Sequence, residues 1–322
     1  MPATHPNLVV ILGPTASGKT SVAAHLAAKI DGEIISADSR QVYRNLNLGT
    51  GKDYDDYIVN GTKIPYHMID NEEPGSQYNV FEYQKDFIHA FDDIIHRGKF
   101  PILCGGSGMY IEAVIRGYRL IQVPINQELR DEMQNMPMEE LTDILKSYKT
   151  IHNVSDSDTK KRIIRAIEIE EYTKNNPVTD TYYPKVNPLL MGIRYDRFTE
   201  RRRITDRLQQ RLDSGMIDEV KNLLQEGITP YQLIYYGLEY KFLTEYITGV
   251  ISYDKMFTLL NTAIHQFAKR QMTWFRRMER QGMKIWWLDG YEKIEEKTNR
   301  IIDILESLNS NSIANLRGNT YI

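Results

Sequence analysis

The chain has 322 residues, 41% of them hydrophobic and 26% charged, which is typical of a soluble globular protein with one large domain and an insertion, or two domains. Its net charge is −3, and its single cysteine, Cys104, excludes an internal disulfide and a multi-cysteine zinc site. The seven histidines form no metal-binding cluster, and no apolar stretch approaches the roughly 18 to 20 residues that span a bilayer. No signal peptide is visible at the start. We therefore expect a cytoplasmic protein without a structural transition metal.

The first predicted element is an apolar strand over residues 8–12, which leads into a Gly-x4-Gly-Lys-Thr segment. Its glycines let the chain fold tightly round an anion, and the helix predicted over residues 19–29 would point its first N–H groups at that anion. Lys19 adds a positive charge and Thr20 offers a hydroxyl to Mg²⁺. The segment therefore predicts a P-loop that binds a polyphosphate, without identifying ATP. Its residues are Gly13, Pro14, Thr15, Ala16, Ser17, Gly18, Lys19 and Thr20.

Four further apolar strands follow along the chain. They are predicted over residues 33–36, 100–104, 189–195 and 284–288, with helices over 80–97 and 109–116. Short apolar strands separated by helices are typical of a parallel sheet covered on both faces. The predicted fold class is therefore α/β, a P-loop NTPase-like parallel sheet flanked by helices. Residues 53–79 are predicted to be an irregular excursion, either a functional loop or a segment with short elements of its own.

The strand pattern stops between residues 123 and 188, where helices are predicted over 129–136, 138–148 and 158–175. We interpret residues 123–188 as a helical insertion domain, and residues 1–122 and 189–322 as the two parts of a catalytic core domain. The remaining chain is predicted to be mainly helical, over residues 200–214, 217–226, 236–248 and 253–280. The tail after Leu308 is predicted to fray.

Asp38 follows the second predicted strand. A nucleotide-hydrolysing P-loop protein would be expected to place a Mg²⁺-binding acid at the end of an apolar strand, yet the strand over 100–104 ends in Gly-Gly-Ser-Gly. Because neighbouring parallel strands converge on one ligand crevice, Asp38 is expected to face the same cavity as Lys19 and Thr20. There it can bind Mg²⁺ indirectly or take a proton from a nucleophile. Capping of the next helix is the structural alternative, and it does not exclude these roles.

Positive charge is concentrated in three clusters despite the acidic total. Residues 194–211 hold seven arginines against three acids (+4), and residues 269–284 hold six basic residues against one acid (+5). The third cluster is Lys160, Lys161, Arg162 and Arg165. Together they indicate a local surface for an anionic partner, whereas any one alone would fit a solvated helix face.

Six segments of the chain together form a recognisable pattern. They are Gly13–Thr20, Asp38-Ser-Arg-Gln-Val-Tyr43, Gly49-Thr50, Gly105-Gly-Ser-Gly-Met-Tyr110, Arg165-Ala-Ile-Glu168 and Ala268-Lys-Arg-Gln-Met-Thr-Trp-Phe-Arg276. They occur in the order found in the bacterial tRNA dimethylallyltransferases, and from about residue 8 to 290 the chain resembles this family. A P-loop alone is shared with many kinases, but the segments that begin at Asp38 and Ala268 are far more specific.

The resemblance implies transfer of a dimethylallyl group from dimethylallyl diphosphate to the N6 amine of adenosine at position 37 of tRNA, 3′ of the anticodon. The P-loop would hold the diphosphate, and Lys19, Thr20 and Mg²⁺ would neutralise it as it leaves. Arg203 would also contact it, on one helix face with Arg207 and Arg211. Asp38 would accept a hydrogen bond from the amine or deprotonate it, and Ser107 would keep the contact of the family's usual threonine.

The expected partners are the donor and the anticodon stem-loop of tRNA, bound by a monomer with no membrane contact. The target base must leave the stacked loop to be reached, and stacking and backbone charge would recognise that loop. At least one of Trp274 and Phe275 is expected to be in the core. The resemblance implies tRNA contacts by Asp38, Ser39, Arg40, Gln41, Ser107, Arg130, Lys161, Arg162, Ile163, Ile164, Arg165, Lys241, Lys269, Arg270, Gln271 and Arg276.

Two segments depart from the family pattern. Gly49-Thr-Gly-Lys-Asp53 replaces Gly-Thr-Ala-Lys-Pro, and Glu239 stands at a usual glycine, where an acid would repel phosphate unless it is turned away. Three alternative functions remain open: a small-molecule or nucleotide kinase that uses ATP, an adenylate prenyltransferase that makes free cytokinin, and a noncatalytic RNA-binding module. The missing strand-end acid and the basic helices disfavour the first, and the insertion disfavours the second.

Overall fold

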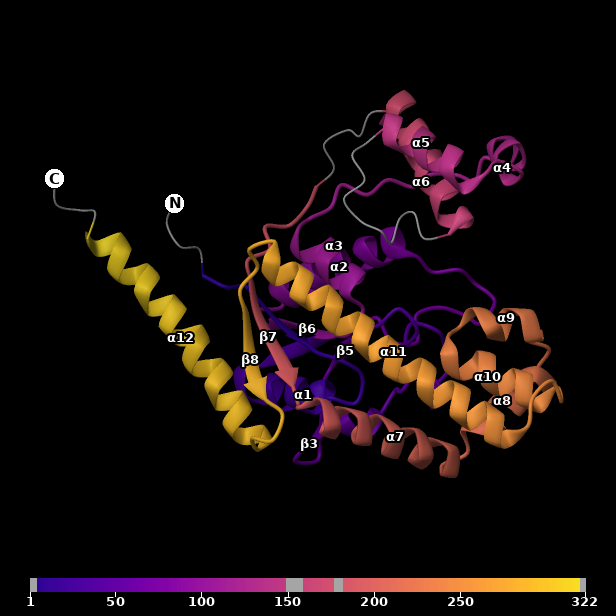
Figure 1. The fold of residues 1–322 in the computed structure, drawn as a ribbon. Coiled ribbons are helices and arrows are strands. Elements are labelled where there is room, and N and C mark those ends of the chain that lie inside the picture. Colours follow the sequence, from indigo (N-terminus) through magenta and orange to yellow (C-terminus); the bar gives the residue numbers. More distant parts are fainter. Residues whose placement is uncertain (1–4, 149–158, 177–181, 319–322) are drawn as a thin grey trace. The chain divides into compact units, whose positions relative to one another are not determined.

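The computed structural model describes residues 5–148, 159–176 and 182–318, and its centre is a six-stranded parallel sheet (Figure 1). The strand order is β5-β2-β6-β1-β7-β8. The predicted α/β class and all five predicted strands are confirmed. The strands are β1 (Leu8–Leu12), β2 (Gly32–Ala37), β5 (Tyr66–His67), β6 (Phe100–Gly105), β7 (Pro188–Arg194) and β8 (Ile285–Asp289).

The register aligns the carboxyl ends of the central strands. Leu12 at the end of β1 pairs with Gly105 of β6, and Gly105 pairs in turn with Ala37 at the end of β2. The loops that begin at Gly13, Gly106 and Asp38 therefore all leave the sheet at one level.

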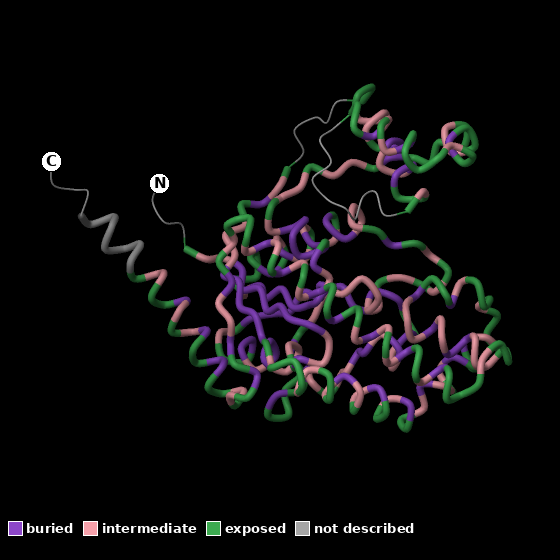
Figure 2. Tube along the Cα trace, in the orientation of Figure 1, coloured by how far each residue is buried: buried purple, intermediate pink, exposed green. Residues whose placement is uncertain are grey.

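Each face of the sheet is buried, as its apolar strands predict (Figure 2). Alternate residues of β1 point to opposite sides, so Val10 packs in one core cluster and Val9 in the other. The first cluster includes α2 (Val80–His96), α3 (Gly108–Ile115) and α11 (Tyr253–Arg280), and the second includes α1 (Lys19–Ile30) and α12 (Ile294–Gly318).

Most predicted helices of the core lie within a few residues of their expected bounds. They include α7 (Arg197–Asp213), α8 (Met216–Gln225) and α10 (Leu238–Ile247). The short α9 (Pro230–Tyr235) was not predicted; it ends before Gly237, whose φ of 134° interrupts the helix expected from residue 236. The prediction of a frayed tail after Leu308 is wrong, because α12 continues to Gly318.

The excursion over residues 53–79 has short elements of its own, one of the two alternatives. A 3₁₀ turn (Tyr54–Tyr57) precedes a hairpin of β3 (Ile58–Val59) and β4 (Thr62–Lys63), and β5 then extends the sheet. Among the described helices, none is both long and apolar enough to cross a membrane.

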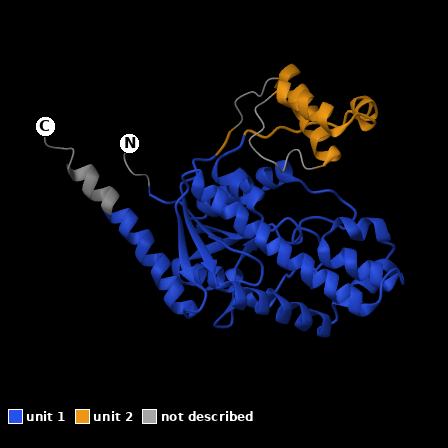
Figure 3. Ribbon diagram, viewed as in Figure 1, with its two compact units in different colours: residues 1–118, 184–322 blue, residues 119–183 orange. Residues whose placement is uncertain are grey.

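The chain divides into two compact units, residues 1–118 with 184–322 and residues 119–183 (Figure 3). The bounds of the second unit differ by a few residues from those of the insertion expected over 123–188. This unit contains α4 (Gln127–Gln134), α5 (Met138–Tyr148) and α6 (Lys160–Asn175). Its core includes Leu141, Ile163, Ile164 and Ile167. Ile163 and Ile164, which were expected to contact tRNA, bury their side chains against those of α4 and α5.

Candidate active site

The P-loop forms an open anion cradle between β1 and α1. Gly18, with φ 80°, precedes α1, and no side chain caps the helix start, so its first N–H groups are available to a ligand. A side chain at Gly13 would meet the carbonyl oxygen of Ile193 at 2.8 Å, which explains a glycine there. Lys19 Nζ donates to the carbonyl oxygen of Pro14 at 2.7 Å. The loop therefore has the shape and donors that a phosphate requires.

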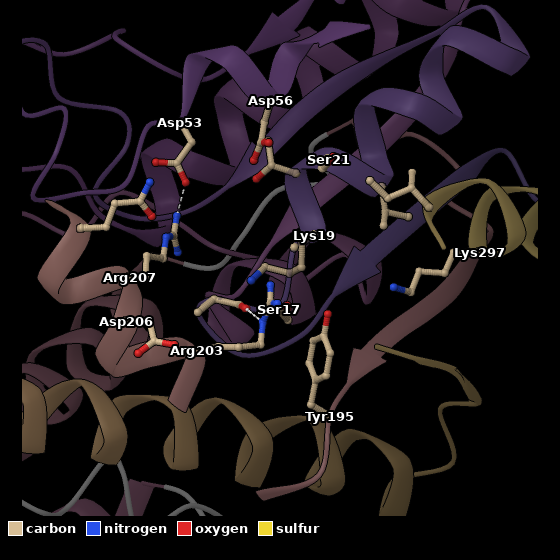
Figure 4. Close-up of a pocket in the computed structure, with 16 residues that line it drawn as sticks. Ser17, Lys19, Ser21, Asp53, Asp56, Tyr195, Arg203, Asp206, Arg207 and Lys297 are labelled. Atoms are coloured by element: carbon tan, nitrogen blue, oxygen red, sulfur yellow. Dashed lines mark hydrogen bonds and ion pairs between the residues drawn. The ribbon is translucent and has the colours of Figure 1, made fainter. Parts of the chain in front are cut away.

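A cavity of about 480 Å³ opens in front of this loop (Figure 4). Four cationic side chains line it, and they come from the P-loop, α7 and α12. Such a concentration of positive charge suits a ligand with several negative charges. The four are Lys19, Arg203, Arg207 and Lys297, and the acids Asp53, Asp56 and Asp206 lie among them.

The arginines of α7 share one face of the helix, as their four-residue spacing predicts, and this face lies beside the P-loop. Arg203 Nε donates to the carbonyl oxygen of Ala16 at 2.9 Å, and its guanidinium lies 4.6 Å from the ring centre of Tyr195. Arg207 forms an ion pair with Asp53, and Arg211 Nη2 lies 3.3 Å from the same carboxylate. The stripe is therefore part of the cavity wall and its support rather than a solvated face.

The Lys19 ammonium is poorly solvated. Burial lowers the pKa of Lys19 to about 8; the charge of Arg207 adds to this shift and that of Asp38 opposes it. A bound anion would supply the missing countercharge. Binding of a diphosphate would therefore raise the pKa of Lys19 and stabilise its charged form.

Asp38 lies just beyond β2. It is not among the residues that line the 480 Å³ cavity, but its charge acts on Lys19, which lines it. Its Oδ1 accepts a hydrogen bond from the backbone N–H of Arg40 at 2.9 Å in a turn, and no helix follows for it to cap. Its charge also acts on Glu239.

Ser107 lies directly against the segment that carries Asp38. Its backbone N–H donates to the carbonyl oxygen of Ala37 at 3.2 Å, and its Oγ accepts from the backbone N–H of Ser39 at 3.2 Å. Ser107 therefore holds the residues on both sides of Asp38. This contact requires only a hydroxyl, which serine and threonine share.

Gln271, one of the residues expected to contact tRNA, is buried between two loops. Its Oε1 accepts from the backbone N–H of Thr15 at 2.9 Å, and its Nε2 donates to the carbonyl oxygen of Gly106 at 2.9 Å. Phe275 is fully buried, which confirms that one of the two neighbouring aromatics is core, and Trp274 Nε1 donates to Glu112 at 2.9 Å.

Lys269 and Arg276 line a second cavity, of about 1110 Å³, between α7, α11 and the ends of β7 and β8. Arg197 and Arg201 line it too. The side chains of Arg40, Lys241 and Arg270 lie over the rings of Tyr235, Phe242 and Phe267. Gln41 accepts from Ser36 Oγ and donates to the carbonyl oxygen of Gly51, so it connects two loops.

In the insertion unit, the buried carboxylate of Glu168 binds both Arg130 and Arg165. Arg165 also donates to the carbonyl oxygen of Val123, so these two arginines hold the unit together. Lys161 and Arg162, by contrast, are exposed.

The two departures from the family pattern both lie beside α7. Asp53 accepts the ion pairs of Arg207 and Arg211, as described above. Glu239 lines a small cavity with Arg211 and Thr15; burial raises the pKa of its carboxyl, and the charge of Arg211 opposes that shift. The acid is therefore placed beside a cation.

The residues that line the P-loop cavity include some that no sequence pattern indicated, among them Tyr195, Asp56 and Lys297. Lys297 belongs to α12, and its Nζ donates to the carbonyl oxygen of Gly290 at 2.6 Å. No motif in the sequence points to it. Asp56 lies in the tyrosine-rich segment that follows the departure at Asp53, which was its only signal.

Among the residues that line the cavity with Thr20, the candidate metal ligands are oxygen donors, with no His or Cys. In the described part of the chain, no group of three His, Cys, Asp or Glu residues could hold a metal. The cavity does combine the Thr20 hydroxyl with the carboxylates of Asp53 and Asp56. Mg²⁺ takes few protein ligands and completes its shell with phosphate oxygens and water, so this set suits it.

The fold and site define the chain as a P-loop α/β protein with a polyanion cavity beside an acid. Residues 41–278, more than half of the chain, match the family model described as IPP transferase, and the chain belongs to that family.

Similar proteins carry matching names. The chain is 60% identical over 293 residues to tRNA dimethylallyltransferase 2 of Bacteroides fragilis, covering 91% of this chain and 96% of that relative. It is 58% identical over 300 residues to tRNA dimethylallyltransferase 1 of Parabacteroides distasonis, covering 93% and 98%.

The crystal structure of the full-length tRNA isopentenylpyrophosphate transferase of Bacillus halodurans has 31% identity and a TM-score of 0.68, and the match covers 94% of this chain and 98% of that one. A eukaryotic dimethylallyltransferase acting on tRNA shares the fold, with a TM-score of 0.70 at 22% identity over 88% and 74% of the chains.

Proposed function

We propose that this protein transfers the dimethylallyl group of dimethylallyl diphosphate to the N6 amine of adenosine at position 37 of tRNA, 3′ of the anticodon. The observation that carries the proposal is the cavity with four cationic side chains at the P-loop, which follows β1. Ser107 follows the neighbouring strand β6, and Asp38 follows β2, the next strand of the sheet. The names of the relatives, which share more than half of its residues, support the same reaction.

The diphosphate occupies the P-loop cradle. Lys19 and Arg203 stabilise the negative charge that grows on the diphosphate as the bond between carbon and oxygen breaks. Thr20, with Asp53 and Asp56, would hold Mg²⁺, which when bound neutralises part of that charge. Tyr195 positions Arg203 through its ring.

Asp38 acts on the other reactant. The N6 nitrogen forms a bond to the first carbon of the dimethylallyl group while the diphosphate leaves, and one proton must leave that nitrogen. Asp38 accepts a hydrogen bond from the amine and then takes its proton. The base reaches this point only after it is extruded from the stacked loop.

The tRNA contacts of the protein are proposed at its accessible basic residues. These include Lys161 and Arg162 of the insertion and Lys269 and Arg276 of α11, where phosphate groups would find cations. Ser39, Arg40, Lys241 and Arg270 remain candidates for the anticodon loop. We expect the protein to act as a monomer in the cytoplasm.

The kinase alternative is not favoured, because β6 ends in Gly105 and its loop in Ser107, so this strand lacks the terminal acid that nucleotide-hydrolysing P-loop proteins use for their metal. An equilibrium titration tests this directly. We expect binding of dimethylallyl diphosphate with Mg²⁺ and weaker binding of ATP; submicromolar ATP binding without donor binding would support a kinase instead.

Single variants test whether Lys19 serves donor binding rather than tRNA binding, and whether Asp38 is catalytic. Lys19→Ala should abolish donor binding and turnover and leave the Kd for tRNA within about threefold, because Lys19 faces the diphosphate cavity. Equal loss of both affinities would contradict the proposal. Full transfer by Asp38→Ala would point to a noncatalytic role for that acid.

A further inference from the structure

Gln271 joins the P-loop to the loop after β6 through one side-chain amide. Its carbonyl oxygen accepts from the Thr15 N–H and its amide nitrogen donates to the Gly106 carbonyl oxygen, each at 2.9 Å. The partners fix the orientation of the amide, because an N–H needs an acceptor and a carbonyl needs a donor. Only 8% of the residue is exposed, so water cannot readily replace these bonds.

The fit around the amide is tight. A Cβ at Gly106 would lie 2.2 Å from Gln271 Nε2, so only glycine allows this approach. Ala268, Phe275 and Met278 on the same helix are fully buried and hold α11 against the core. The packing of α11 and the close approach of Gly106 therefore leave the amide little freedom to move.

The loop after β6 also contacts the segment that carries Asp38. Ser107 follows Gly106, and its N–H and Oγ bind Ala37 and Ser39, the residues on either side of Asp38. A continuous set of hydrogen bonds thus runs from the P-loop through Gln271 and Ser107 to the segment that carries Asp38. It connects the place proposed for the donor with the group proposed to receive the proton.

We propose that Gln271 is a positioning residue that, together with Ser107, sets the separation between the diphosphate cradle and Asp38. The inference rests on the proposed function and adds a role that touches neither substrate. A transfer reaction needs the carbon and the nitrogen within close reach, and a displacement of about 1 Å can reduce the rate about 100-fold. Loss of the amide should therefore reduce turnover more than it weakens binding of either substrate.

The test compares Gln271→Met, which keeps the volume but makes neither bond, with Gln271→Glu, which keeps only the acceptor for Thr15. Gln225→Met, at the exposed end of α8, is the matched control. We expect kcat to fall about 10- to 100-fold in the first and by less in the second, with the donor KM and the tRNA Kd within about threefold of wild type.

Two further measurements separate positioning from a general loss of structure. Ser107→Ala combined with Gln271→Met should reduce kcat less than the product of the single effects, since both act on one set of bonds. Amide exchange of residues 13–16 and 105–108 should accelerate in the Gln271 variants without substrate, which tests the link independently of activity.

Unchanged kcat in Gln271→Met, or an equal loss of tRNA affinity and kcat, would overturn the inference; the second result would indicate direct RNA contact. If Gln271→Met fails to fold, Gln271→Glu decides by the same criteria. A wild-type protein that transfers no prenyl group would refute the proposed function, whereas active wild type with unaffected variants would refute only this inference.

Discussion

Glu219 accepts the backbone N–H of Leu48 at 2.7 Å, and the same carboxylate accepts the N–H groups of Asn47 and Gly49 and the hydroxyl of Tyr240. Four donors on one carboxylate fix the start of the loop that leads to Asp53. Since Asp53 in turn binds Arg207 and Arg211, Glu219 supports one wall of the diphosphate cavity from α8.

Glu219→Gln should therefore disturb both stability and donor binding. Each carboxylate oxygen accepts two hydrogen bonds, so an amide nitrogen in place of either oxygen leaves two of the four donors without their acceptor. We expect a decrease of about 1–3 kcal/mol in the free energy of unfolding and a several-fold increase in the donor KM. Urea denaturation and steady-state kinetics measure these, with the exposed Glu226→Gln as control; no change in either would contradict the role of Glu219.

Donor binding should weaken at alkaline pH. The free protein holds the pKa of Lys19 at about 8 by burial, and a bound diphosphate would raise it. The affinity is thus constant below pH 8 and falls as the pH rises above 8, by up to about tenfold per pH unit, because the free lysine must gain a proton to bind. Calorimetric titration without tRNA measures this, and a pH-independent affinity between 8 and 9.5 would contradict it.

Arg203 should be replaceable by neither alanine nor lysine. Lysine keeps the charge but loses the Nε bond to Ala16 and the contact of the guanidinium with the Tyr195 ring. We expect kcat/KM for the donor to fall about 100-fold or more in Arg203→Ala and about tenfold in Arg203→Lys. The exposed neighbour Arg202→Ala is the control for donor kinetics, and an Arg203→Lys variant with wild-type kcat/KM would show that charge alone suffices.

Glu33 provides a stability test away from the site. Its buried carboxylate binds Arg97 and His67, and the hydrogen bonds of Arg97 lower the pKa of Glu33 to about 2. Its contribution is present above the usual pKa of about 4.5 and is lost as the pH falls from there towards 2. Glu33→Gln should lower the free energy of unfolding by about 2 kcal/mol at pH 7 and flatten its decrease between pH 4.5 and 3. If the free energies of unfolding of the wild type and Glu33→Gln decreased in parallel between pH 4.5 and 3, this role of Glu33 would be contradicted.

The sequence predicted those features that depend on local patterns. The apolar runs located β1, β6 and β7, and the P-loop followed from glycine and lysine spacing. The burial of Gln271 could also have been predicted from the periodicity of α11. Its buried face holds Ala268, Gln271, Phe275 and Met278, which recur every three or four residues. The same reasoning applies to Ile163, Ile164 and Ile167 in the insertion, where resemblance alone suggested RNA contact.

Other features depend on tertiary packing and have no local signal. Lys297 enters the cavity because α12 packs on α1, and Tyr195 because it follows β7 at the aligned strand ends. Strand convergence located Asp38 at the right edge of the sheet but could not give the direction of its side chain. That direction is set by a turn, through the bond to the Arg40 N–H.

The central claim is most directly tested by mass spectrometry of nucleosides from unmodified tRNA incubated with the protein, dimethylallyl diphosphate and Mg²⁺. We predict one added five-carbon unit on the adenosine 3′ of the anticodon, absent with Lys19→Ala and strongly reduced with Asp38→Asn. Two results would contradict the claim that these two residues bring donor and amine together. One is a tRNA that gains no prenyl group from the wild-type protein; the other is a tRNA that gains it from Asp38→Asn and Lys19→Ala as readily as from the wild type.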